Sequence, residues 1–112
     1  MNSQELKQCI DKIEECADQA KQAVQAGSAP NELRQSIDQL HQQAREGKQA
    51  GAGTGEAQLR ECVLKLEQIA DRAMQACRNA GSQVDQQTQQ AVQRAHDEAS
   101  RAKKEIQAGS PA

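Results

Sequence analysis

Aromatic side chains are missing from this chain of 112 residues, which contains no Phe, Tyr or Trp. Without them the chain offers no platform on which an unpaired nucleic-acid base can stack. Charges of the two signs nearly cancel, because 14 basic and 16 acidic residues leave a net charge of −2. A nucleic-acid interface needs a basic excess. The composition therefore predicts that no nucleic acid is a partner.

Long apolar runs are missing as well. No stretch approaches the roughly 18 apolar residues that cross a bilayer. The longest basic run, Lys103-Lys104, is too short to hold the chain on an anionic membrane. Residues 1–5 have neither the basic nor the apolar region of a signal peptide. The sequence therefore predicts a cytoplasmic protein with no membrane partner, whose four cysteines are thiols rather than disulfides.

Proline is scarce, with two residues, and good helix formers such as Ala, Gln, Glu, Lys and Arg dominate. In two segments the apolar residues recur at about three positions in seven, which is the pattern of a core-facing helix. Two further segments carry a weaker stripe of the same period. The four stripes are Leu6, Cys9, Ile10, Ile13, Cys16, Ala17, Ala20, Ala23 and Val24; Leu33, Ile37, Leu40 and Ala44; Leu59, Cys62, Val63, Leu66, Ile69, Ala70, Ala73, Ala76 and Cys77; and Thr88, Val92, Ala95, Ala99, Ala102 and Ile106.

The second half of the chain repeats the first at a shift of 53 to 55 residues. The segment from Leu6 to Ile10 aligns with Leu59 to Val63, and both halves keep one apolar register. Such self-similarity indicates a repeated supersecondary unit, here of two helices. The alignment also pairs polar residues, namely Glu14 with Glu67, Asp18 with Asp71, His41 with His96, and Lys48 with Lys103.

These patterns predict an all-α fold, a four-helix bundle made from two tandem, duplicated antiparallel helical hairpins. We expect one domain over residues 1–112, with repeat 1 at 4–50, a Gly-rich linker at 51–55 and repeat 2 at 56–108. Gly81 is expected to end the third helix, and Ser82 with Asp85 resembles a capping box for the fourth. Because alanine fills much of the inner face, the core should be thin, which makes a homodimer a plausible assembly.

The four cysteines, Cys9, Cys16, Cys62 and Cys77, all fall on the apolar stripes. Buried cysteine often serves as a small hydrophobic residue, and this is the first interpretation. Two alternatives stay open: a redox or disulfide role, and a thiolate site for Cu(I) or Zn²⁺ inside the bundle. No CxxC pair is present, although close pairs are usual in zinc sites.

The two histidines, His41 and His96, hold equivalent positions just outside the stripes. The first interpretation is a solvated surface pair inherited by duplication, and the alternative is a phosphorelay bundle. No Glu precedes either histidine by three residues, so the Glu-x-x-His spacing of di-iron bundles is missing.

Two apolar residues, Leu64 and Met74, lie off the stripes where repeat 1 has Asp11 and Lys21. They are the predicted interaction residues.

No nucleophile motif or cofactor motif is present in the chain. The leading hypothesis is a non-enzymatic protein without a cofactor, which binds another protein or a second copy of itself through its helix faces. The alternative from a different class is a thiol-based metal-binding protein that uses the core cysteines. A histidine phosphorelay bundle is the weaker third hypothesis.

Overall fold

The computed structural model describes residues 3–26, 30–49, 55–81 and 84–108. They form four helices, α1 (Ser3–Ala26), α2 (Asn31–Gln49), α3 (Glu56–Ala80) and α4 (Gln86–Ala108), and no strand occurs in these ranges. The all-α prediction is confirmed. Residues 51–54 of the predicted linker lie outside the described ranges.

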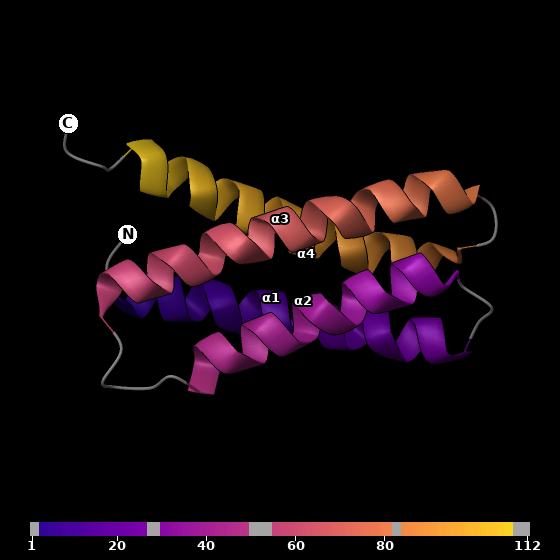
Figure 1. Ribbon diagram of the computed structural model, residues 1–112, viewed down its shortest axis with the longest axis horizontal. Helices are drawn as coiled ribbons and strands as arrows, with labels where there is room; N and C mark the ends of the chain where they lie inside the picture. Colours follow the sequence, from indigo (N-terminus) through magenta and orange to yellow (C-terminus); the bar gives the residue numbers. More distant parts are fainter. Residues whose placement is uncertain (1–2, 27–29, 50–54, 82–83, 109–112) are drawn as a thin grey trace.

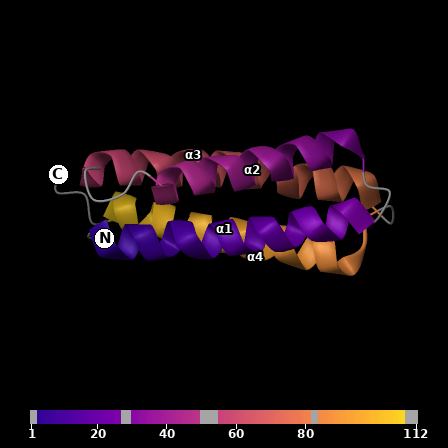
Figure 2. The same cartoon turned by 90° about the horizontal axis from the view of Figure 1, so that it is seen from below.

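Successive helices run antiparallel and pack side by side along the long axis of a body that measures 43 × 27 × 17 Å (Figure 1). Seen from below, α2 and α3 form one layer and α1 and α4 form the other (Figure 2). Each helix contacts the helices before and after it, and α4 closes the ring against α1. The helix order around the bundle is thus the order of the chain. Interfaces within one predicted repeat (α1–α2 and α3–α4) alternate with interfaces between the repeats (α2–α3 and α4–α1).

The core follows the four predicted stripes. Nearly every stripe residue is buried, and the exceptions, Cys16, Ala23, Ile69 and Ile106, are half-buried. Alanines occupy much of the inner surface, so that the helices pack with little side-chain volume between them. The larger fully buried aliphatic side chains contribute most of the hydrophobic stabilisation, at roughly 1.5–3 kcal/mol each; they are Leu6, Ile10, Ile13, Leu33, Ile37, Leu40, Leu59, Val63, Leu66 and Val92.

The turn between α3 and α4 shows how the chain stops one helix and starts the next. Gly81 has a positive φ of 58°, and its N–H donates to the carbonyl oxygen of Cys77, which ends α3 where the sequence predicts. The N-cap of α4 is Asp85, because its Oδ1 accepts a hydrogen bond of 2.8 Å from the backbone N–H of Thr88. The hydrogen bonds from Thr88 also lower the pKa of Asp85. Ser82, the cap residue of the predicted capping box, lies outside the described ranges.

Gly47 allows α2 to pack tightly against its neighbours near its C-terminal end. A Cβ atom at this position would lie 2.5 Å from Cys62 Sγ and 3.4 Å from two side-chain carbons of Ile10. A carbon and a sulfur cannot approach so closely. The absent side chain is therefore a packing requirement of the interface between α2 and α3.

We expect Gly47→Ala to lower the free energy of unfolding by about 1 kcal/mol. Overpacking a core costs about 1–3 kcal/mol, which exceeds the roughly 0.5–1 kcal/mol that alanine gains over glycine in a helix. In a Cys62→Ala background, where the sulfur is missing, this cost should disappear. Urea denaturation of the unmodified chain, Gly47→Ala, Cys62→Ala and the double variant measures the cost of Gly47→Ala in both backgrounds. An equal cost in the two backgrounds would show that the contact with Cys62 is not its cause.

Candidate functional site

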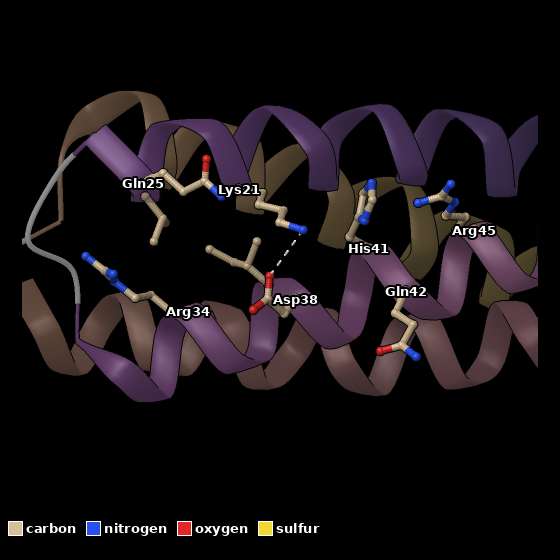
Figure 3. A pocket seen from close by; sticks show the side chains of 9 residues that line it. Lys21, Gln25, Arg34, Asp38, His41, Gln42 and Arg45 are labelled. Atoms are coloured by element: carbon tan, nitrogen blue, oxygen red, sulfur yellow. Dashed lines mark ion pairs between the residues drawn. The ribbon is translucent and has the colours of Figure 1, made fainter.

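A groove of about 600 Å³ runs along the surface between α1 and α2. Figure 3 shows its polar side chains, with Lys21 and Gln25 coming from α1 and Arg34, Asp38, His41, Gln42 and Arg45 from α2. Val24 and Ile37 also line it, and both are buried. The groove thus has a charged rim and lies over two core residues that are almost fully covered.

The rim of this groove is basic although the whole chain is slightly acidic. Three permanent cations, Lys21, Arg34 and Arg45, line it together with a single carboxylate, that of Asp38. Lys21 Nζ lies 3.8 Å from Asp38 Oδ1, and the side chain of Lys21 is 39% exposed. An ion pair that is this long and this exposed is weak. The ammonium group of Lys21 therefore stays accessible to an anionic ligand.

A smaller groove of about 340 Å³ lies between α3 and α4, at the place that the sequence alignment makes equivalent. Its lining differs in character. Met74 stands where the α1–α2 groove has Lys21, Cys77 where it has Val24, and Gln93 where it has Asp38. The two hairpins thus present one basic groove and one that is more apolar. Grooves of about 350 and 420 Å³ at the α2–α3 and α1–α4 interfaces each have four glutamines in their lining.

Both histidines are half-buried, and each faces an aspartate on the preceding helix. His41 Nε2 lies 3.7 Å from Asp18 Oδ1, and His96 Nε2 lies 3.6 Å from Asp71 Oδ1. A carboxylate at this distance repels a phosphoryl group on the same nitrogen. The geometry therefore gives no support to the phosphorelay hypothesis.

The surroundings of the two histidines differ. His96 Nδ1 lies 3.9 Å from Asp97 Oδ1, whereas repeat 1 has Gln42 at the position of Asp97. Glu67, which like Asp71 is on α3, also lies near His96. Ligand atoms of Glu67, Asp71 and His96 all lie within 4.8 Å of one another. In the described part of the chain, this three-residue group of possible metal ligands contains no cysteine.

The cysteines lie apart from one another rather than in one site. Cys9 Sγ lies 3.9 Å from the carbonyl oxygen of Glu98 on α4, and Cys62 Sγ lies 3.8 Å from that of Gln43 on α2. These two thiols therefore face opposite interfaces of the bundle. Cys77 belongs to a second core cluster, and half-buried Cys16 packs against the first. All four are free.

Burial keeps these thiols protonated. Desolvation raises the pKa of all four, and that of Cys9 reaches about 12, with the charge of Glu98 adding to the effect of burial. The thiolate is the nucleophile and the metal ligand. The arrangement accordingly favours cysteine as a core residue over cysteine as a reactive group.

The two predicted interaction residues, Leu64 and Met74, are both half-buried. Met74 packs against the second core cluster and lines the α3–α4 groove. No large hydrophobic residue of the described ranges is fully exposed.

The sequence analysis did not find the basic groove, because this groove depends on which helices are neighbours. It also missed the Glu67–Asp71–His96 group, although the alignment of His96 with His41 and of Asp71 with Asp18 was a usable signal.

No protein-family model, curated protein or solved structure matches the chain. None of the helices in the described ranges combines the length and the apolar character that crossing a membrane requires.

Proposed function

We propose that the chain is a non-enzymatic protein-interaction module, which binds an acidic amphipathic segment of a partner protein in the groove between α1 and α2. The observation that carries the proposal is the basic rim formed by Lys21, Arg34 and Arg45, in a groove that lies over the almost fully covered core residues Val24 and Ile37. A helix or strand whose acidic residues face this rim complements its charge.

The proposal that the chain is not an enzyme rests on the state of its candidate nucleophiles. The thiols are protonated and mostly buried. The free thiols also support a cytoplasmic location, where thiols stay reduced.

We further propose that the bundle arose by duplication of one helical hairpin. Two kinds of contact recur at aligned positions and support this origin. Cys9 contacts the carbonyl of Glu98 as Cys62 contacts that of Gln43, and His41 faces Asp18 as His96 faces Asp71. The two copies then diverged in their grooves, so that only the α1–α2 copy has a strongly basic rim.

The proposed function is tested by fluorescence anisotropy with a labelled peptide in which Glu and Leu are spaced so that they lie on opposite faces of a helix. We expect binding that weakens with added salt, since rim charges contribute through screened electrostatics. The double variant Lys21→Met and Arg45→Ser installs the residues found in repeat 2, and we expect it to bind about tenfold more weakly, or roughly 1.4 kcal/mol. Asp38→Gln removes the one carboxylate of the rim and should bind more tightly than the unmodified chain.

The matched control is Lys104→Met, which makes the same change at an exposed lysine outside the groove and should leave the affinity unchanged. Equal binding of a peptide with Lys in place of Glu would refute the charge complementarity, as would equal losses of affinity in the control and the groove variants.

A second copy of the chain is the rival occupant of the groove. If mass measured by light scattering doubles with concentration and Leu64→Lys or Met74→Lys abolishes the change, self-association replaces the acidic partner.

A further inference from the structure

We propose that Glu67, Asp71 and His96 form a binding site for a divalent first-row transition-metal ion, with Zn²⁺ as its probe. The site lies on the α3–α4 face, apart from the α1–α2 groove, and it is independent of the function proposed above. Imidazole together with carboxylate is a ligand set that suits Zn²⁺ and its neighbours in the first transition row.

The separations of the ligand atoms fit such an ion. Asp71 Oδ1 and His96 Nε2 are 3.6 Å apart, and one ligand atom of each residue lies within 4.8 Å of the others. Zinc bonds of about 2.1 Å in a tetrahedron place ligand atoms about 3.4 Å apart. Side-chain rotations that shorten these separations would close the site, and a fourth position stays open to water.

The backbone beneath the ligands is held by the core. Glu67 and Asp71 are four residues apart on α3 and thus share one face of that helix. The residues beside them and beside His96 are fully buried, which fixes the positions from which the three side chains extend; these neighbours are Leu66, Ala70 and Ala95. The cost of ordering the site on metal binding is then confined to side-chain rotations.

A second carboxylate lies behind the histidine ligand. Asp97 Oδ1 is 3.9 Å from His96 Nδ1, the nitrogen on the other side of the ring from the proposed ion. A small side-chain rotation would bring the two into a hydrogen bond that orients the ring, with Nε2 facing Asp71 and the ion. Metal-bound histidines are typically oriented in this way by an outer carboxylate.

Lys103 is the competing cation of the site. Its Nζ lies 3.0 Å from Glu67 Oε1, so that part of the negative charge of Glu67 is already neutralised. In repeat 1 the aligned lysine, Lys48, pairs with Asp11 instead, at 2.9 Å. Leu64 replaces that aspartate in repeat 2, which leaves Lys103 with Glu67 as its partner. We therefore expect Lys103→Gln to strengthen metal binding.

The first repeat supplies a control within the same molecule. His41 faces Asp18 much as His96 faces Asp71. However, Gln42 takes the place of Asp97, and His41 belongs to no three-ligand group within the described residues. The variants His96→Ala and His41→Ala therefore make the same change, one at the proposed site and one at its aligned counterpart.

Titration of the reduced chain with Zn²⁺ against a fluorescent chelator tests the proposal. We expect one ion per chain, an affinity at least about tenfold weaker in His96→Ala and in Asp97→Asn, and no change in His41→Ala. Titration with Co²⁺ should give a d–d spectrum without a thiolate-to-cobalt charge-transfer band. The site is refuted by unchanged affinity in His96→Ala, by an equal loss in His41→Ala, by an absence of binding, or by a thiolate band, which would assign the ion to the cysteines.

Discussion

Replacing Leu66 by alanine is expected to lower the free energy of unfolding by about 3 kcal/mol. The side chain is fully buried in the larger core cluster, and Leu→Ala changes at such positions cost about 2–5 kcal/mol through lost burial and the cavity left behind. Much of the surrounding surface is alanine, which has no side chain long enough to fill the space. Against a typical total of about 5–15 kcal/mol, the loss should be plain in urea denaturation followed by circular dichroism.

Leu64→Ala is the matched control, because it makes the same change two residues away on the same helix. Leu64 is half-buried and belongs to neither core cluster, so that we expect a loss below about 1 kcal/mol. Similar losses at the two positions would mean that α3 does not present Leu66 to the core in the way the structure shows.

Alkaline pH should destabilise the bundle through Cys9. Burial raises the pKa of this thiol from 9.0 to about 12, so the folded chain keeps a proton that the unfolded chain loses. The free energy of unfolding must then fall as the pH rises above about 9, and this fall continues until the folded thiol itself titrates near 12. Allowing for solvent screening, we expect about 2 kcal/mol from Cys9 by about pH 11.

The measurement is the urea midpoint between about pH 8 and pH 11 for the unmodified chain and for Cys9→Ala, which should show a shallower decline. Cys16→Ala serves as the comparison, since this thiol is only half-buried and its removal should change the slope less. Declines of equal steepness in the unmodified chain and Cys9→Ala would assign the alkaline effect to other groups, the lysines and the remaining cysteines, rather than to this thiol.

The core could be predicted because the helical periodicity of the apolar residues is visible in the sequence alone. A residue such as Ile10 or Ala95 recurs at helical spacing with its apolar neighbours, and the stripe that contains it is buried in the structure. Gly81 was predictable for a related reason, since a helix end favours a residue that adopts a positive φ. The N-cap of α4 was less predictable, because a capping box at Ser82 and a simple cap at Asp85 differ only by local geometry.

The grooves and the metal-ligand group could not be predicted from spacing, because they depend on which helices are adjacent. Lys21 and Arg45 are far apart in the sequence and lie in one groove only because α1 packs against α2. In the same way, Glu67 meets His96 only because α3 packs against α4. The internal repeat was the one sequence feature that marked such a pairing in advance, since it carried an aspartate and a histidine in both halves.

The most direct test of the proposed function is to locate the bound acidic peptide by nuclear magnetic resonance. Amide spectra of the ¹⁵N-labelled chain would be recorded as the Glu/Leu peptide is added. We expect the shift changes to concentrate around Lys21, His41 and Arg45, along the groove between α1 and α2. Changes confined to α3 and α4, or no changes at saturating peptide, would contradict the proposal that this groove is the binding site.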